Sequence, residues 1–523
     1  MNPKILLTVP LLLLCSAASA ENDFHMNNEF SLNYNKVSGP GKSASSLTEN
    51  LNYLEVLNLN GGGRKSGWDY NYNLGLKATD DERNDIKTVL LTNLNGVFRK
   101  NANTVSLGDI FESFSQYTLA TSLKGASYKY AKNGGRAPEI TALFGYAYPR
   151  WDSVWKEPLT RTVARRAYGA RAKENFSDSL SAGLSYINVK DTGRVNAADA
   201  LYDSYNLALD LNYNPFPGLT VAGEHSLSDY DENAAGVSAK GSATRIELVG
   251  DADPSRVSLE YEEVQPDFFS ALGAAVSDRR KVKTKWRYKY SRHTTFNSGL
   301  LWYRNNLPGS SAADTTQSWR PELGMAVKKI FSARPYSFAD FSYKFDRKFG
   351  SGSSRADHHL NVNYRDRFAG LDSDSNLGYT LYKTEADVRD ASEINFNTSL
   401  NSRQEKGNWV LKPQLNLGTW YSDDELTGYT DKIYEYSLGL GAELPGKNIT
   451  SDLRLGQNVL KKEDAASDDS SRFFASLGAY WRTKIMKYDS TVFLRAGYNG
   501  FDFSTSSRNF REKTVTLGVN TQF

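Results

Sequence analysis

Cysteine is almost absent from this sequence. The only one among the 523 residues is Cys15, which lies within the first twenty. If those twenty residues are removed on export, the mature chain has no thiol. This absence excludes disulfides, thiolate metal sites, iron–sulfur clusters, a cysteine nucleophile and covalently attached c-type haem. We therefore expect no cofactor and no metal site in this chain.

Long apolar runs are also missing beyond the N-terminus, so the sequence offers no transmembrane helix. Only 39% of the residues are apolar, which is below the usual share of about 45–50%. Yet 12% are aromatic, including 31 Tyr and 25 Phe, and a disordered chain would not carry so many rings. A polar chain that is rich in Tyr and has 40 Gly is typical of an all-β protein whose strands have one apolar face each.

A strong excess of either charge is lacking as well. Lys and Arg total 63 and Asp and Glu total 60, for a net charge of +3. No basic arm or strongly basic domain accompanies this balance, so we expect no nucleic-acid partner.

The N-terminus has the features of a secretory signal. Lys4 precedes the apolar stretch ILLTVPLLLLC, and Ala18-Ser19-Ala20 fits a cleavage site before Glu21. Cys15 could instead be a lipidation site, but bulky Leu14 stands where lipoprotein signals have a small residue. We predict a signal peptide over residues 1–20 and a barrel over residues 21–523.

From residue 26 onward, one unit repeats: about ten residues that alternate apolar and polar, followed by a turn rich in Gly, Asn, Asp, Ser or Pro. In residues 203–213, for example, Tyr205, Leu207 and Leu209 share one face and Asn206 and Asp210 the other. We count 26 such segments, near residues 27–36, 48–60, 67–77, 83–99, 103–110, 117–130, 138–148, 162–174, 178–190, 203–214, 218–228, 240–251, 255–265, 280–291, 294–304, 316–330, 334–347, 355–366, 375–384, 392–402, 407–420, 431–444, 449–461, 471–482, 487–499 and 512–523.

The connections between these segments alternate in length. Tight turns, such as residues 251–255 and 445–448, are followed one strand later by longer polar loops, such as residues 266–279 and 462–470. Short turns on one side and long loops on the other are typical of bacterial outer-membrane barrels. We predict a single large antiparallel transmembrane β-barrel of about 26 strands, within a range of 22–26. An even number places both termini on the periplasmic side.

The last ten residues, TVTLGVNTQF, form a strand that ends at Phe523. Here the sequence resembles Gram-negative outer-membrane proteins, whose final strand with a terminal Phe is the signal for the barrel-assembly machinery. The resemblance implies the outer membrane as the location, the assembly machinery as a partner, Phe523 as the assembly signal, and lipid and lipopolysaccharide as the surroundings.

The polar faces should point into the lumen, and their charges come in neighbouring rows of opposite sign. One interpretation is a cationic stripe that attracts anionic solutes. The other is that carboxylates on adjacent strands neutralise the stripe, which the nearly equal charge totals favour. The candidate lumen residues that contact solute are Lys281, Lys283, Lys285, Arg287, Lys289, Glu260, Glu262, Arg245, Glu247, Arg165 and Arg171.

Residues 101–137 depart most from the repeat, and we predict that they narrow the lumen as bent strands or a small inward fold. Their Gly108-Asp109 pair and the following F…L-x-G stretch resemble the early barrel strands of fimbrial ushers. The separate periplasmic and plug domains of ushers are missing, which argues against an usher function.

Two classes of function remain open. A porin-like channel would pass polar or charged solutes. Alternatively, a wide barrel without a plug resembles, in strand number, the outer-membrane sheaths that hold multihaem cytochromes, so a partner such as an exported cytochrome would fill it; export of polysaccharide or protein is a further alternative. No G-x-S-x-G, H-E-x-x-H or phosphate loop is present, so we do not expect an enzyme.

Overall fold

The computed structural model describes residues 23–86, 88–132, 137–148, 150–152, 165–192, 200–233, 236–312, 314–350, 353–384, 390–464 and 467–523. The predicted signal peptide, residues 1–20, lies outside these ranges. No helix in the described ranges is long and apolar enough to cross a membrane.

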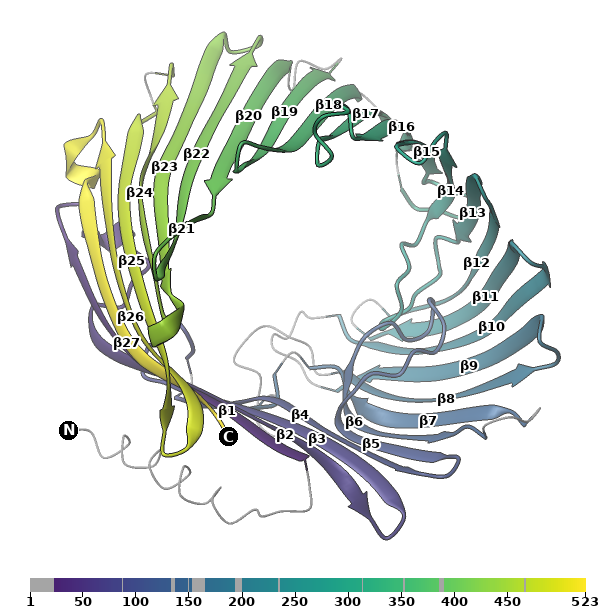
Figure 1. Cartoon of the computed structure of the whole chain (residues 1–523). Helices are drawn as coiled ribbons and strands as arrows, with labels where there is room; N and C mark the ends of the chain where they lie inside the picture. Colours follow the sequence, from purple (N-terminus) through teal and green to yellow (C-terminus); the bar gives the residue numbers. More distant parts are fainter. Residues whose placement is uncertain are drawn as a thin grey trace.

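The chain forms one closed antiparallel sheet of 26 strands, which confirms the predicted all-β barrel and its strand number. Figure 1 shows the ring of strands, with the first strand beside the last. Its first half contains β1 (Asp23–Ser38), β2 (Asn50–Lys65), β3 (Trp68–Thr79), β4 (Val89–Lys100), β5 (Asn103–Ile110), β6 (Leu123–Tyr130), β7 (Glu139–Tyr146), β8 (Arg165–Asn175), β9 (Leu180–Asp191), β10 (Tyr202–Phe216), β11 (Leu219–Glu232), β12 (Val237–Ala252) and β13 (Ser255–Val264).

The second half of the ring contains β14 (Arg279–Lys289), β15 (Thr294–Arg304), β16 (Gln317–Lys328), β17 (Phe338–Gly350), β18 (Ser353–Phe368), β19 (Leu371–Thr384), β20 (Ala391–Ser402), β21 (Gln404–Lys406), β22 (Trp409–Asp424), β23 (Tyr429–Leu444), β24 (Ile449–Lys462), β25 (Ser470–Ile485), β26 (Tyr488–Phe503) and β27 (Phe510–Gln522). Both β20 and the three-residue β21 pair with β22, so they count as one strand. Short 3-10 turns occupy Lys42–Ala44, Pro445–Lys447 and Ser506–Arg508.

Each of the 26 predicted segments corresponds to one strand, although some boundaries were wrong. The segment predicted at 117–130 begins as a strand only at Leu123, because Tyr117 and Leu119 are fully buried in a non-strand connection. The segments predicted at 218–228 and 240–251 are longer than predicted at their facing ends, because β11 and β12 remain paired out to Glu232 and Val237.

The barrel closes between β1 and β27, which pair without a shift from Asn27↔Gln522 to Ser38↔Arg511. Backbone hydrogen bonds in both directions between Met26 and Phe523 (3.2 and 2.8 Å) extend the closure to the last residue. The start of β1 and the end of β27 therefore lie at the same rim, which we call the terminal rim.

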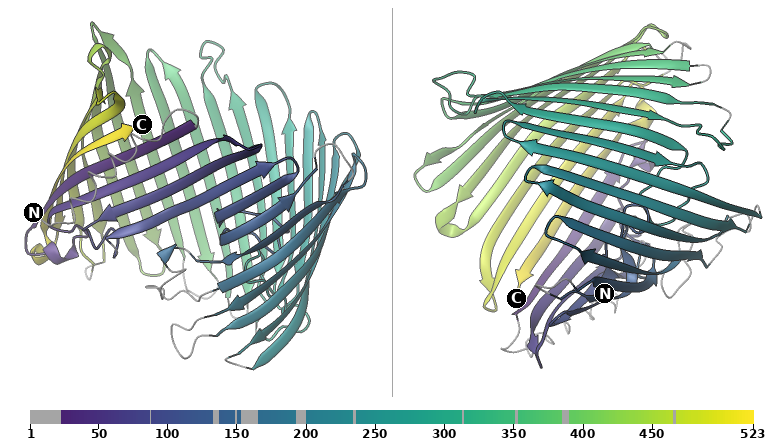
Figure 2. Two further views of the ribbon diagram at one scale, coloured as in Figure 1. Left: turned by 90° about the horizontal axis from the view of Figure 1, so that it is seen from below. Right: turned by 90° about the vertical axis from the view of Figure 1, so that its right-hand side faces the viewer.

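Most connections at the terminal rim are shorter than those at the opposite rim, which we call the loop rim, although residues 329–337 form a longer one at the terminal rim and residues 425–428 a shorter one at the loop rim. Connections at the terminal rim include residues 66–67, 101–102, 217–218, 253–254 and 486–487. Connections at the loop rim include residues 111–122, 265–278 and 305–316. Figure 2 shows the strands running obliquely through the wall between these rims.

The two faces of the wall follow the alternation of the sequence. On β10, Leu207, Leu209 and Leu211 are exposed on the outer surface, whereas Asn206 and Ala208 are fully buried on the inner side. A barrel in contact with lipid needs such an apolar outer band. Closure of the sheet also leaves no unpaired strand edge in the lipid.

Candidate functional site on the inner wall

Five of the predicted lumen residues form one ion-pair network on β12, β13 and β14. The strand register aligns Arg245 with Glu262, and Glu262 with Lys281. Arg245 contacts Glu247 at 2.7 Å and Glu260 at 3.3 Å. Lys281 lies 2.9 Å from Glu260 and also pairs with Glu262. Neighbouring strands thus neutralise this part of the cationic row.

The rest of the row differs from the network. Lys283, Lys285 and Arg287 follow Lys281 along the same face of β14, and none of them forms an ion pair with a carboxylate of the described residues. Glu260 is opposite Lys283 in the register, but its carboxylate is engaged by Lys281 and Arg245. Three cations of this row are therefore free of ion pairs in the described ranges, and successive members are two residues apart, or about 6.6–6.8 Å.

Three other predicted cations form ion pairs with carboxylates and are therefore not free. Lys289 binds Asp253 at 2.9 Å, in the turn at the terminal rim. Arg165 binds Asp191 at 2.8 Å.

Arg171 is the third of these cations. Its guanidinium donates to both carboxylate oxygens of Asp210, at 2.7 and 2.9 Å, and to the Ser185 hydroxyl at 2.6 Å. This bidentate pair fixes the guanidinium between neighbouring strands.

Residues 111–122, which connect β5 to β6, turn inward and attach to the network. The backbone N–H groups of Gln116 and Tyr117 donate to the Glu224 carboxylate at 3.2 and 3.0 Å. The hydroxyl of Tyr117, which is fully buried, donates to Glu262 at 2.9 Å. One carboxylate of the wall, that of Glu262, thus holds both Lys281 and this connection.

A second connection, residues 265–278 between β13 and β14, packs beside the first. The two are joined by backbone hydrogen bonds from Ala120 N to Leu272 O (2.9 Å) and from Ala274 N to Gln116 O (2.8 Å). The ring of Phe268 meets that of Tyr117 edge-on, with centroids 5.8 Å apart. We refer to residues 111–122 and 265–278 together as the inward segments.

Small residues on the wall make room for the inward segments. A Cβ atom at Gly241 of β12 would lie 2.3 Å from the backbone nitrogen of Phe268. Nearby, Ser228 accepts a hydrogen bond from Phe269 N at 3.1 Å, and Asn206 donates to Phe269 O at 2.8 Å. The inner wall is therefore shaped for this backbone.

Apolar side chains complete the contact where the wall departs from the polar-inside pattern. On the inner face of β9, Ile187 and Val189 are almost fully buried, and they belong to one cluster with Phe114, Leu119 and Leu272 of the inward segments. Burial of such side chains away from water stabilises the docked arrangement. All these contacts involve strands between β7 and β13, on the side of the ring where Figure 1 draws the inward segments.

Sequence reasoning missed Tyr117, Glu224 and Asn206 as residues that shape the lumen. Tyr117 and Glu262 are 145 residues apart in the sequence, and no local pattern predicts their contact. A signal did exist in β9, where Ile187 and Val189 place apolar residues on a face that otherwise has Ser185 and Asp191.

No cluster of three or more His, Cys, Asp or Glu side chains that could hold a metal ion occurs in the described ranges.

Comparison with known proteins gives likeness of structure only. No family model and no curated protein matches this sequence. The structure is similar to OpdL of Pseudomonas aeruginosa, at 12% identity and a TM-score of 0.38, over 70% of this chain and 99% of that one. It is also similar to the translocation pore of the P pilus usher PapC, at 9% identity and a TM-score of 0.39, over 95% of this chain and 99% of the usher chain. A third similar structure is OccK5 (OpdH) of Pseudomonas aeruginosa, at 10% identity and a TM-score of 0.35, over 70% of this chain and 98% of that one. These likenesses are too distant to indicate a function.

Proposed function

We propose that this chain is a porin-like channel of the Gram-negative outer membrane that passes polar solutes and prefers anions. The observation that carries the proposal is the row of free cations Lys283, Lys285 and Arg287 on the inner wall. Barrels of 16–18 strands already enclose an aqueous channel, and this one is larger. Fixed charge of one sign in such a channel raises the local concentration of the opposite ion.

The proposed orientation places the terminal rim in the periplasm and the loop rim outside the cell. Short turns on the terminal rim and longer connections on the loop rim support it, since outer-membrane barrels have short periplasmic turns. In this orientation the inward segments descend from the extracellular side and narrow the lumen beside β7 to β13.

Conductance of the purified barrel in planar lipid bilayers tests the channel. We expect steady conductance and a reversal potential that shows anion preference under a salt gradient. Replacing the row together (Lys283→Gln, Lys285→Gln and Arg287→Gln) should bring the permeability ratio close to that of free solution. The matched control replaces three exposed lysines at the terminal rim: Lys65→Gln, Lys406→Gln and Lys447→Gln. A folded barrel that does not conduct, or equal loss of selectivity in both triple variants, would contradict the proposal.

A second candidate function is a sheath whose lumen a partner fills, such as an exported cytochrome. The strand number favours it, because barrels of 16–18 strands already enclose an aqueous channel and this one has 26. Both inward segments pack against strands between β7 and β13. A very large conductance that does not change when Lys283, Lys285 and Arg287 are replaced would favour this candidate, since a cell would not tolerate such an opening unfilled.

A further inference from the structure

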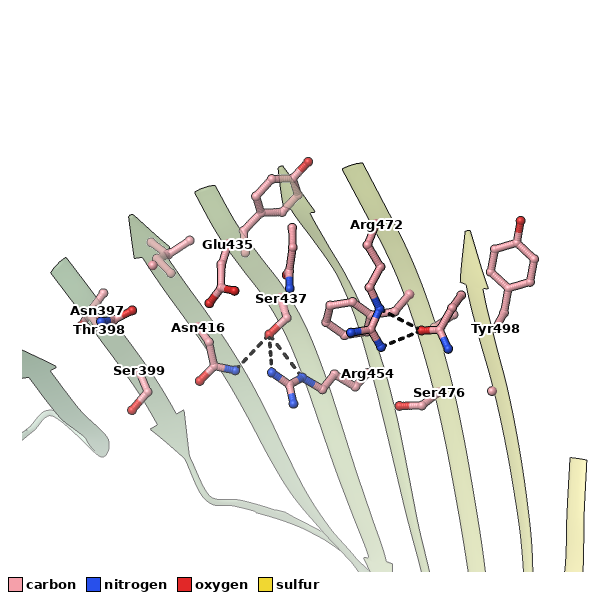
Figure 3. A pocket seen from close by; sticks show the side chains of 18 of the residues that line it. Asn397, Thr398, Ser399, Asn416, Glu435, Ser437, Arg454, Arg472, Ser476 and Tyr498 are labelled. Atoms are coloured by element: carbon pink, nitrogen blue, oxygen red, sulfur yellow. Dashed lines mark hydrogen bonds between the residues drawn. The ribbon is translucent and has the colours of Figure 1, made fainter. Parts of the chain in front are cut away.

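A recess of about 680 Å³ lies on the inner wall across β19 to β26, away from the network and the inward segments. Figure 3 shows its side chains: Asn416 and Arg454 meet at the hydroxyl of Ser437. Arg472 lies on β25, the strand next to that of Arg454. The volume falls within the range of about 300–1,000 Å³ that is usual for small-molecule sites.

Among the described residues, two guanidinium groups are the cations that line the recess. Arg454 donates from Nε and Nη2 to the Ser437 hydroxyl at 3.3 and 3.2 Å. Arg472 donates from Nε and Nη2 to the side-chain oxygen of Asn499 at 3.1 and 2.8 Å. Neither forms an ion pair with a carboxylate of the described chain, in contrast to Arg245 or Arg171.

The same two groups are held in place by an aromatic ring. The guanidinium carbons of Arg454 and Arg472 lie 5.4 and 5.6 Å from the centroid of Phe474, and Arg472 also lies 5.6 Å from that of Phe501. A guanidinium has five N–H donors in a fixed plane, and only part of each set is used by neutral oxygens of the wall. The remaining donors are preorganised for an incoming anion.

The rest of the lining consists mainly of amides and hydroxyls. Asn397, Asn416 and Ser437 come from three adjacent strands, and Asn416 donates to the Ser437 hydroxyl at 3.1 Å. Gly418 and Gly497 also line the recess. Such a surface can both donate to and accept from hydroxyl groups.

We propose that this recess binds an acidic saccharide, a short chain of sugar units that carries carboxylates. Its carboxylates would accept from Arg454 and Arg472, and its hydroxyls would bond to the Asn and Ser side chains beside them. The inference deepens the proposed function, because it rests on a water-filled lumen that the saccharide can enter.

Two carboxylates also line the recess, and they lead to a further expectation about the affinity for an anionic ligand. Asp374 is paired with Arg365 at 2.8 Å, whereas Glu435 has no ion-pair partner in the described ranges. Glu435 should therefore repel an anionic ligand weakly, and Glu435→Gln should strengthen binding.

Titration calorimetry with the purified, folded barrel in detergent tests the recess, with trigalacturonic acid as the probe and maltotriose as the neutral saccharide of equal length. We expect trigalacturonic acid to bind and maltotriose not to bind measurably. Arg454→Gln and Arg472→Gln should each raise the Kd by about ten-fold or more, because each removes charge-assisted hydrogen bonds. Arg292→Gln, in the turn between β14 and β15, is the matched control and should leave the Kd unchanged.

Four outcomes separate the possibilities. Equal effects of Arg292→Gln and the recess variants would overturn the site, and equal binding of inorganic sulfate would overturn the saccharide class. Conductance without binding would overturn the recess and leave the channel standing. Binding without conductance would support the recess and overturn the channel.

Discussion

A single substitution at Gly241 should disrupt the docking of the inward segments on the inner wall. A Cβ there would lie 2.3 Å from Phe268 N and 2.5 Å from the carbonyl carbon of Asp267. Ordinary contacts begin near 3.4 Å, so in Gly241→Val the backbone of residues 265–278 must retreat by roughly 1 Å. Such a shift breaks the hydrogen bonds of Phe269 to Ser228 and Asn206, at about 1 kcal/mol each, and the edge contact of Phe268 with Tyr117, at about 0.5–1.5 kcal/mol.

Together these losses amount to about 3 kcal/mol, which shifts the docking equilibrium by about a hundred-fold. We expect Gly241→Val to fold as a barrel, to show larger single-channel conductance with more frequent transitions, and to be cleaved by added protease within residues 265–278. Gly250→Val is the matched control, because a Cβ at Gly250 on the same strand would meet nothing within 4 Å. If both variants match the parent in conductance and cleavage, the fit of the inner wall to these residues does not hold the segments in place.

Two further predictions concern the ends of the barrel. At the loop rim, the Thr505 hydroxyl and the Arg508 guanidinium hold the pKa of the Asp468 carboxyl below its usual value of about 3.9. Because the pKa of Asp468 is lower in the folded protein than in the unfolded one, its contacts stabilise the loop at pH values above the unfolded pKa, and this stabilisation is lost as the pH falls through the folded pKa. Cleavage of residues 504–509 by an acid-tolerant protease should therefore increase below about pH 4. Asp468→Asn should remove this pH dependence. At the terminal rim, deletion of Phe523 should lower the yield of folded, heat-modifiable barrel in the outer membrane, because the centroid of its ring lies 4.3 Å from that of Tyr488 and its backbone bonds to β1. An unchanged yield would contradict the prediction that Phe523 is the assembly signal.

The wall could be predicted from the sequence because its causes are local. Alternation in residues 203–213 decides which side chains face lipid, and the structure places Leu207, Leu209 and Leu211 on the outer surface accordingly. The alternation of short and long connections then predicts which end of each strand lies at which rim, and an even number of strands brings the ends of the chain to one rim.

The lumen could be predicted only in part, because its contacts join distant parts of the chain. The row on β14 was found from alternation, but which of its members remain free depends on the carboxylates of β12 and β13 and on the register between them. The Arg454 and Arg472 pair was missed, because neither has a basic neighbour two residues away on its strand. The register between β24 and β25 brings both guanidinium groups to the ring of Phe474.

Docking of the inward segments and the charge of the lumen are coupled through two carboxylates. Glu224 is held by the backbone N–H groups of Gln116 and Tyr117, and no cation pairs with it in the described ranges. Glu262 shares its oxygens between Tyr117 and Lys281. If the segments leave, the Glu224 charge faces the lumen without its donors and offsets part of the field of Lys283 and its neighbours. Gly241→Val should therefore conduct more and select anions less, whereas simple widening would preserve the sign and source of the selectivity. Measuring both quantities on one variant separates a passive constriction from a segment that also sets which ions pass.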